Sequence, residues 1–207
     1  MFAVVVLDYA KEICELHGEL ELSKECQVLG KEIKDGIEKY GTIEHPFYGR
    51  VYVYETDGKG QYVTMDDANV PSLLAAPYLG YCSYSDVTYQ NTRKLILSRE
   101  NPYYYEGKKA RGIGSPHTPD HYIWHIALSI QGLTSISSDE RQQILDYLIT
   151  TDGRKGYMHE GFNSDDPTEF TRSWFAWSNS MFSEFVLSLV GKAIKHTPLS
   201  RQLNNRN

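Results

Sequence analysis

The sequence lacks any cluster of lysine or arginine, and its 207 residues carry a formal net charge of −6. A surface that binds nucleic acid needs clustered basic side chains to neutralise phosphates. The sequence also lacks an apolar stretch of the ~18 residues that a membrane-spanning helix requires. These two absences predict that neither nucleic acid nor a membrane is a partner.

Cysteine is scarce: the chain has only Cys14, Cys26 and Cys82, and no CxxC pair. An odd number without paired spacing favours reduced thiols over a disulfide framework, with a Cys14–Cys26 disulfide as the alternative. No basic segment precedes the short apolar run at residues 2–7, as a secretory signal would require. We therefore predict a cytoplasmic protein.

Hydrophobic residues make up 41% of the chain and charged residues 23%, which is typical of one globular domain over residues 1–207. Apolar spacings of three and four predict six helices, with Ser23 and Asp86 as N-caps and Ser137 with Glu140 as a capping box. Their expected ranges are residues 2–17, 23–40, 86–97, 121–131, 137–150 and 169–196. Alternating residues around positions 57–60 predict a small β-hairpin within residues 48–63. Helix pairs joined by long loops predict an all-α fold, about half of an α/α toroid.

Three long loops, residues 63–85, 100–119 and 151–168, are rich in polar and aromatic residues, and loops of this length are commonly functional. The first contains Asp66, Asp67 and Asn69, whose oxygen atoms suit either a metal or the vicinal hydroxyls of a sugar. The alternative is that Asp67 or Asn69 caps a helix.

The second loop holds His117 between two glycines and two prolines, in the segment GIGSPHTP of residues 112–119. Glycine and proline fix an unusual backbone path that aims the imidazole, although a lone loop histidine is more often a hydrogen-bonded surface residue. His117, Asp120 and His121 lack a zinc spacing with a matched carboxylate. We predict no metal and no cofactor.

The third loop contains His159 and Glu160, and residues 170–177 follow with Arg172, Trp174 and Trp177. A carboxylate among aromatic rings is a candidate general base, whose pKa burial raises and a nearby arginine lowers. The alternatives are a surface glutamate and a tryptophan stripe in the core of the last helix.

Together, the loops have the composition of a sugar-binding pocket. Planar amide and carboxylate groups bind hydroxyls, and aromatic rings pack on the C–H face of a pyranose. The chain has 16 tyrosines and an aromatic content of 13%, in line with this interpretation. The residues themselves therefore predict a carbohydrate-active helical domain.

Five segments resemble glycoside hydrolase family 125, the metal-independent exo-α-1,6-mannosidases. They are MDDANVPSLLAAPYLGY (65–81), NTRKLILSRENPYYYEG (91–107), GIGSPHTP (112–119), MHEGF (158–162) and TRSWFAWSNSMF (171–182). These strings are long and unusual, and they span nearly the whole chain. The resemblance implies an (α/α)6 barrel, here its C-terminal half, that removes terminal α-1,6-linked mannose from a glycan with inversion.

The resemblance also implies roles for individual residues. Glu160 is the general base, and the general acid is an aspartate upstream of Met1, outside these 207 residues. The substrate contacts are Asp66, Asp67, Asn69, His117, His159, Arg172 and Trp174. His125, Gly161 and Ser173 depart from the family's pattern, where proline, serine and proline are usual. We therefore expect the missing N-terminal half to be a partner.

Two alternatives stay open. The segment DDAN resembles the acidic motif of metal-dependent terpene cyclases. Those enzymes also need a second motif, which Asn179 and Ser183 could begin, but Leu187 occupies the position of its acidic residue. The other alternative is an inactive remnant or a carbohydrate-binding fragment, because the lost general acid contributes ~10²–10⁴ in rate. On that ground we expect little activity from the chain alone.

Overall fold

The computed structural model describes residues 1–192, which form six α-helices and nine short β-strands. The helices are α1 (Phe2–Leu16), α2 (Leu20–Tyr40), α3 (Val87–Ile96), α4 (His125–Leu133), α5 (Ser138–Thr150) and α6 (Ala176–Leu189). The strands are β1 (Thr42–His45), β2 (Gly49–Tyr52), β3 (Glu55–Thr56), β4 (Tyr62–Val63), β5 (Tyr104–Glu106), β6 (Arg111–Ile113), β7 (Tyr122–Trp124), β8 (Gly161–Asn163) and β9 (Phe170–Thr171). The fold is helix-rich as predicted, with more strand pairs than the sequence indicated.

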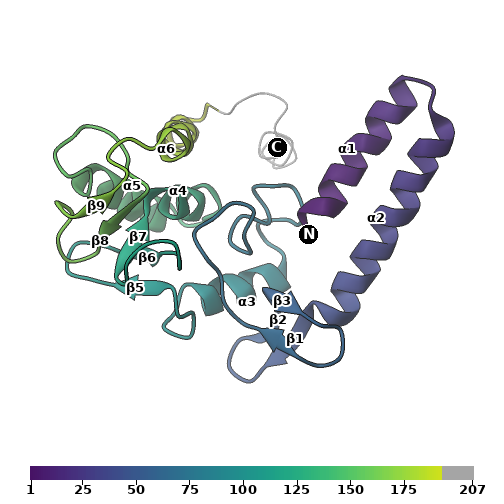
Figure 1. Ribbon diagram of the computed structural model, residues 1–207, viewed down its shortest axis with the longest axis horizontal. Helices are drawn as coiled ribbons and strands as arrows, with labels where there is room; N and C mark the ends of the chain where they lie inside the picture. The colour runs from purple at the N-terminus through teal and green to yellow at the C-terminus, as the bar shows by residue number, and fades with distance from the viewer. Residues whose placement is uncertain (193–207) are drawn as a thin grey trace.

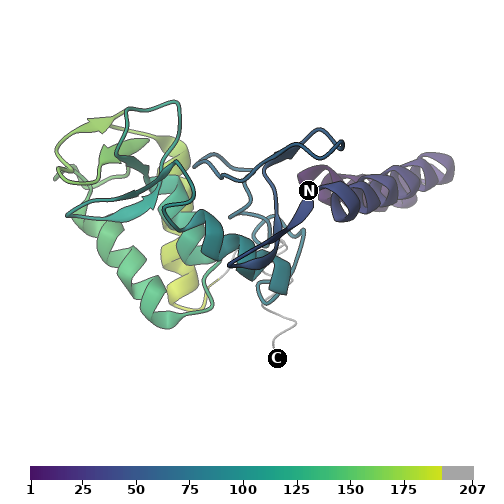
Figure 2. The same ribbon diagram turned by 90° about the horizontal axis from the view of Figure 1, so that it is seen from below.

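Helices α1 and α2 form an antiparallel hairpin that projects from the rest of the molecule (Figures 1 and 2). Gly18, with a φ of 76°, permits the tight turn between them. The prediction that Ser23 caps the second helix is wrong, because α2 already begins at Leu20. The Ser23 hydroxyl instead donates a hydrogen bond to Glu15 Oε1 (3.1 Å) and ties the two helices together.

The β-hairpin predicted within residues 48–63 is present as β3–β4, and a further hairpin, β1–β2, begins before this range. Strand β1 pairs with β2 and β3 pairs with β4, both antiparallel. The turn predicted at residues 57–60 is confirmed, since Asp57 Oδ1 accepts the backbone N–H groups of Lys59 and Gln61. Gly58 and Gly60 supply the positive φ angles of this turn. Strands of two to four residues are too short for an alternating pattern to separate the two pairs.

Two predicted helix caps are confirmed, one of them in part. At the start of α3, Asp86 Oδ1 accepts the backbone N–H three residues further on (2.8 Å). At the start of α5, Ser137 Oγ accepts the backbone N–H of Glu140 (3.3 Å). The carboxylate of Glu140 does not complete the capping box, because it accepts hydrogen bonds from Ser135 and Arg93 instead.

Two helices begin later than predicted because strands precede them. Residues 122–124 form β7, so α4 starts at His125 and not at residue 121; β9 likewise delays α6 to Ala176. Strand β7 pairs with β8, and β8 with β9, in one antiparallel sheet. The spacing of aromatic residues at 170–177 is typical of a helix. Residues 170–171 form a strand instead, because they pair with β8. The predicted end of the last helix at residue 196 lies outside the described residues.

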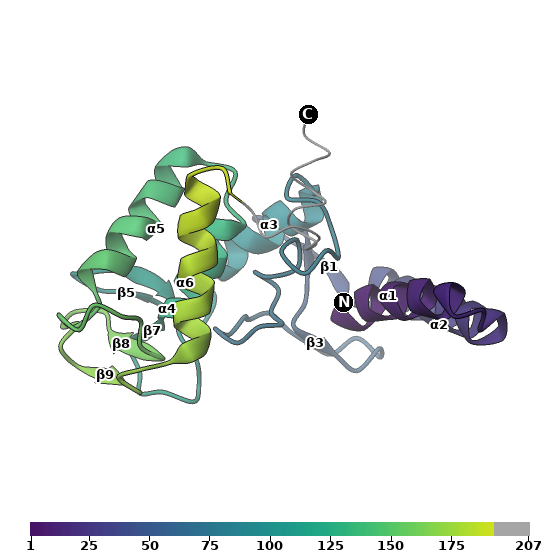
Figure 3. The ribbon, with the colours of Figure 1, turned by 90° about the horizontal axis from the view of Figure 1, so that it is seen from above.

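Helix α4 forms the centre of the core, and eight of its nine residues are buried. It packs against α5 and α6, which lie together on one side of the molecule (Figure 3). Gly132 of α4 permits the close approach of α6, since a Cβ there would lie 2.5 Å from the Phe185 ring. Ile123 of β7 and Phe162 of β8 extend the core to the three-stranded sheet. Strand β8 lies within the third loop, so the packed sheet anchors this loop.

Membrane-spanning helices and disulfides were both considered in the sequence analysis. Among residues 1–192, no helix has the length and apolar composition needed to cross a membrane. Cys14, Cys26 and Cys82 all lie in the described part, and no disulfide joins them. The cytoplasmic location and the single-domain organisation of residues 1–207 stay predictions.

Candidate active site

Glu160 and Arg172 face each other at the end of the three-stranded sheet. Gly161 pairs with Thr171 in the β8–β9 register, so positions 160 and 172 are the next opposite pair. The backbone N–H of Glu160 donates to Thr171 O (3.3 Å). Arg172 Nε lies 3.2 Å from Glu160 Oε1, and the Glu160 side chain is only 13% exposed. The antiparallel register thus holds a shielded carboxylate against a guanidinium.

His159, which precedes Glu160 in the chain, supports this pair. It has no exposed surface, and its ring stacks on Phe170 with centroids 3.9 Å apart. Its Nδ1 lies 2.6 Å from Ser173 O and its Nε2 lies 3.0 Å from Asp152 O. Both ring nitrogens therefore contact backbone carbonyls, and the ring fixes the segments on either side of Glu160.

His125 supports the same segment, a role that the sequence did not reveal. The backbone N–H of His159 donates to His125 Nδ1 (3.0 Å), and His125 Nε2 lies 3.0 Å from the Thr151 hydroxyl. Burial, together with the neighbouring His159, lowers the pKa of His125 to about 3. The ring is therefore neutral and stacks on Phe162, with centroids 4.6 Å apart. The available signal was a histidine inside an otherwise apolar helix, where a buried ring needs partners.

Asn179 is the second supporting residue that the sequence analysis missed. Its Oδ1 accepts the backbone N–H of Met158 (3.0 Å), and its Nδ2 donates to the backbone oxygens of Met158 (2.9 Å) and Phe175 (2.8 Å). One side chain of α6 thereby holds both the third loop and the segment before α6. No local pattern marks this role, because its partners are backbone atoms.

Exposed and half-buried aromatic rings lie in the segments next to Arg172 and Glu160. Trp174 is 61% exposed and meets Tyr157 edge to face, with ring centroids 5.4 Å apart. The Arg172 guanidinium carbon lies 5.5 Å from the centre of the Phe175 ring. Trp174 precedes α6, so the prediction that it belongs to a core stripe on a helix is wrong at this position. An exposed indole offers an apolar face to a ligand.

The two aspartates of the first loop have different surroundings. Asp66 is 0% exposed, and its two oxygens accept the backbone N–H groups of Leu73 and Leu74 at 2.9 Å each. Burial raises the pKa of Asp66 to about 7, although these hydrogen bonds act in the opposite direction. Asp67 Oδ1 accepts from the backbone (2.6 Å) and the side chain (2.9 Å) of Asn69. Residues 66–69 are in neither a helix nor a strand, so neither Asp67 nor Asn69 caps a helix.

A series of contacts joins the three loops. Ala68 N donates to Gly114 O (2.9 Å), which links the first loop to the second. In the second loop, Thr118 Oγ1 accepts the indole N–H of Trp124 (2.9 Å). Trp124 lies opposite Gly161 in the β7–β8 register. Gly161 directly follows the candidate base, Glu160. Hydrogen bonds and strand pairing therefore link the segments that carry the three sequence clusters.

The histidines of the second loop do not form a metal site. His117 is exposed, and its backbone N–H donates to Ser115 Oγ (3.3 Å). His121 has a φ of 67°, and its ring lies 5.4 Å from the Tyr105 ring. Across residues 1–192, no group of three or more His, Cys, Asp or Glu side chains has an arrangement that could hold a metal ion.

The chain is similar to proteins of one enzyme family. The family model described as metal-independent alpha-mannosidase (GH125) matches residues 1–187. A metal-independent α-mannosidase of Streptococcus pneumoniae, solved in a non-productive substrate complex with α-1,6-mannobiose, is 49% identical with a TM-score of 0.88. That match covers 91% of this chain and 45% of the other. The Meiotically up-regulated gene 157 protein of Schizosaccharomyces pombe is 43% identical over 188 residues, 90% of this chain and 37% of that protein.

A bacterial glucoamylase solved with acarbose shares the fold alone, with a TM-score of 0.74 at 14% identity. The match covers 97% of this chain and 35% of that one. Both solved proteins have the (α/α)6 toroid fold. This chain spans less than half the length of each of these relatives. From the match over residues 1–187, the chain belongs to the metal-independent α-mannosidases, glycoside hydrolase family 125.

Proposed function

We propose that the chain supplies the general base and part of the mannose pocket of an inverting exo-α-mannosidase that removes terminal α-1,6-linked mannose. The position of Glu160 carries the proposal: its carboxylate is shielded and paired with Arg172, which stands two residues before the exposed Trp174. A carboxylate in this setting can take a proton from a water that attacks a sugar. Family membership and the mannobiose complex of the solved relative support the substrate class.

Inversion needs a second carboxyl group that protonates the leaving oxygen, ~6.5–9.5 Å from the base. Asp66 does not suit this role, because it is 0% exposed and both of its oxygens accept backbone hydrogen bonds. We therefore propose that the acid is an aspartate in polypeptide that corresponds to the remaining length of the relatives, N-terminal to the region matched here. In this division Glu160 activates the water on the opposite face of the sugar ring.

The proposed mannose contacts fall into two groups. Asp67, Asn69 and His117 offer hydroxyl partners, and Arg172 and Trp174 offer a guanidinium and an apolar face. Asp66 and His159 were expected in the same group, but both are fully buried with their polar atoms engaged by the backbone. We assign these two a supporting role beneath the contact residues.

The apolar surface of the α1–α2 hairpin supports the proposal of a partner. Ile13 is 56% exposed, Leu16 85% and Leu20 68%, with further apolar side chains exposed along both helices. Contiguous apolar surface on a folded protein marks an interface. The match covers 45% of the solved relative. We propose that the hairpin packs against the rest of an (α/α)6 toroid, of which this chain forms about half.

The proposal is tested by an assay of α-1,6-mannobiose hydrolysis with two samples. The first is this chain alone, for which we expect little or no turnover. The second is this chain co-expressed with polypeptide corresponding to the N-terminal region of the longer relatives, here called the complete enzyme. We expect turnover by the complete enzyme, and NMR of the first-formed anomer should show inversion.

The role of Glu160 is tested in the complete enzyme. Glu160→Gln should reduce kcat by ~10²–10⁴, because it removes the general base without changing the size of the side chain. Glu169→Gln is the matched control, since Glu169 is exposed in the same region and contacts Asn163. Unchanged hydrolysis by Glu160→Gln would overturn the assignment of the base. Robust turnover by the chain alone would overturn the need for a partner.

A second candidate is an inactive remnant or a carbohydrate-binding fragment. It is favoured by the share of the relatives that the chain covers, 37% and 45%. Mannobiose binding by the chain, with no hydrolysis by the complete enzyme, would support this alternative. The rival reading of DDAN as a metal-binding motif is opposed by Asn179, whose side chain holds backbone atoms. Activity that is unchanged by EDTA would agree with a metal-independent reaction.

A further inference from the structure

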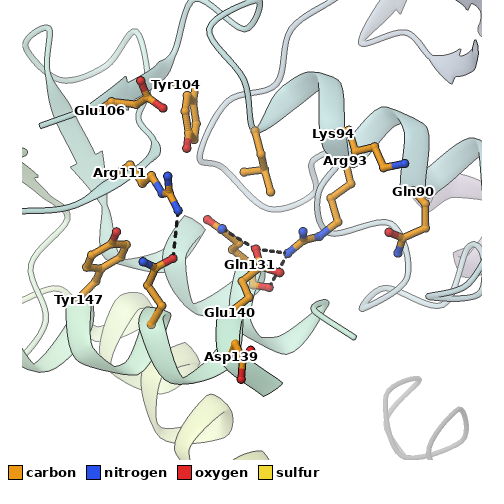
Figure 4. Close-up of a pocket in the computed structure, with 12 residues that line it drawn as sticks. Gln90, Arg93, Lys94, Tyr104, Glu106, Arg111, Gln131, Asp139, Glu140 and Tyr147 are labelled. Carbon is orange, nitrogen blue, oxygen red and sulfur yellow. Dashed lines mark hydrogen bonds and ion pairs between the residues drawn. The ribbon is translucent and has the colours of Figure 1, made fainter. Parts of the chain in front are cut away.

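A cavity of about 620 Å³ lies between α3, the β5–β6 hairpin and α5 (Figure 4). Helix α3 contributes Arg93, the hairpin contributes Tyr104 and Arg111, and α5 contributes Gln143 and Tyr147. The close-up shows the two arginines reaching toward the centre from opposite walls. Its volume falls within the ~300–1,000 Å³ that is usual for small-molecule sites.

This cavity is separate from the candidate active site. Glu160 is not among the residues that line it. Gln131, which does line it, lies near the C-terminal end of α4, whereas His125 beside the active-site loop begins that helix. Their separation of six positions corresponds to ~9 Å along a helix axis. A ligand in the cavity would therefore occupy a different place from a mannose at Glu160.

Acidic and basic side chains are equal in number in the cavity lining. Three lining residues are basic and three are acidic: Arg93, Lys94, Arg111, Glu106, Asp139 and Glu140. Two of the acidic groups are already paired, Glu140 with Arg93 (2.9 Å) and Glu106 with Arg99. Arg99 lies outside the lining, so the remaining Lys94, Arg111 and Asp139 leave a formal excess of one positive charge. Without a larger excess of either sign, the lining suits a neutral polar ligand.

The inner wall is rigid because its polar groups bind each other. Arg93 Nη2 donates to Gln131 O (3.0 Å) and Glu140 Oε1 (2.9 Å), and Gln131 Nε2 donates to the same carboxylate oxygen (2.8 Å). Burial would raise the pKa of Glu140, but Arg93 and the hydrogen bonds from Gln131 and Ser135 lower it overall. The wall is therefore charged and pre-formed, which favours binding without reordering.

The outer wall presents amide and phenol groups. Gln143 Oε1 accepts from Arg111 Nη2 (3.3 Å), and in the described part of the chain its NH₂ group has no protein acceptor. Tyr147 and Tyr104 are half-buried and line the same cavity. Amide donors bind hydroxyl oxygens, and tyrosine combines an apolar ring with a hydroxyl group. These groups match a polyhydroxylated ligand that carries no charge.

We propose that this cavity is a second carbohydrate site, which binds a neutral oligosaccharide away from Glu160. The choice of a mannose oligosaccharide as its ligand rests on the proposed function, whereas the preference for a neutral sugar rests on the cavity lining. In the enzyme, such a site would hold a remote part of the glycan whose terminal mannose is removed. Hydrolysis and binding at this cavity are separable properties.

The test uses the full 207-residue chain and α-1,6-mannotriose as the probe, followed by ¹H–¹⁵N NMR of the glutamine side-chain amides. Addition of the sugar should shift the Gln143 NH₂ signals but not those of Gln142. Gln143→Ala should weaken binding at this site roughly three- to tenfold, as the loss of one hydrogen bond to a neutral group predicts. Gln142→Ala is the matched control, because Gln142 is exposed on the same helix and donates to Asp146.

Three results would overturn the proposal. One is the absence of shifts at Gln143 with millimolar mannotriose. Another is equal weakening by Gln143→Ala and Gln142→Ala. The third is shifts at Gln143 with inorganic phosphate but not with the sugar, which would make the cavity an anion site. Glu160→Gln should leave these shifts unchanged, so a failure of the proposed hydrolase function does not affect this result.

Discussion

Arg172 Nε lies 3.2 Å from Glu160 Oε1, and the two residues face each other beyond the last pair of the β8–β9 ladder. Arg172 adopts a φ of 41°, in the left-handed region that favours glycine. Such a conformation costs a non-glycine residue about 1–2 kcal/mol. Backbone outliers of this kind are common at functional sites, because the surrounding structure holds them in place.

The first prediction separates the guanidinium of Arg172 from its backbone. In the complete enzyme, Arg172→Gly and Arg172→Ala should both lower kcat by roughly 10²-fold, since Glu160 loses the group that orients it. Urea denaturation of the chain should find the glycine variant more stable than the alanine variant by about 1 kcal/mol, because glycine tolerates the positive φ. Full activity of Arg172→Gly would show that the arginine serves the turn and not the base.

The second prediction concerns Trp174. This indole is 61% exposed, so Trp174→Ala should change the free energy of unfolding by only about 0.5 kcal/mol. If the ring packs on the sugar, the same variant should raise KM for mannobiose roughly three- to tenfold. Trp174→Phe keeps an aromatic face and should recover most of the affinity. A large loss of stability with unchanged KM would assign Trp174 to packing against Tyr157.

The third prediction is a pH dependence that arises from His125. The folded protein lowers the pKa of His125 to about 3, below its ordinary value of 6.5. The unfolded chain therefore binds the extra proton first as pH falls, and the stability contributed by neutral His125 is lost between about pH 6.5 and 3. His125→Gln removes this titration.

The measurement is the difference in unfolding free energy between the wild-type chain and His125→Gln. This difference should be largest at pH 7 and shrink toward pH 4. Comparing the two proteins cancels the titration of groups that both share. A difference that stays constant with pH would contradict a neutral, buried His125.

The fourth prediction tests the close contact between the second loop and strand β7. A Cβ on Gly114 would lie 2.0 Å from Tyr122 O, so Gly114→Ala must move the backbone. We expect a loss of about 1–3 kcal/mol in thermal or urea unfolding. Gly36→Ala is the control: a Cβ there meets no atom within 4 Å, and it lies inside α2. That variant should be about 0.5–1 kcal/mol more stable than the wild type.

Features that depend on neighbouring residues were predictable from the sequence. The caps at Asp86 and Ser137 and the turn at residues 57–60 follow from side chains that bind backbone groups two or three positions away. The helix spacing placed all six helices, and the polar loops identified the region that holds Glu160 and Arg172. The start of α2 was missed because the favourable cap residue Ser23 lies inside the helix.

Features that depend on distant partners required the folded structure. Residues 122–124 and 170–171 become strands because β8 lies between them, and no local spacing reveals that pairing. The same holds for His125, Asn179 and His159, whose roles come from backbone atoms brought close by the fold. A residue's type and spacing specify what it can bind, whereas its actual partner depends on segments that meet only when the core packs. The chemistry available to this protein was therefore readable along the chain, and the support that holds Glu160 in position was not.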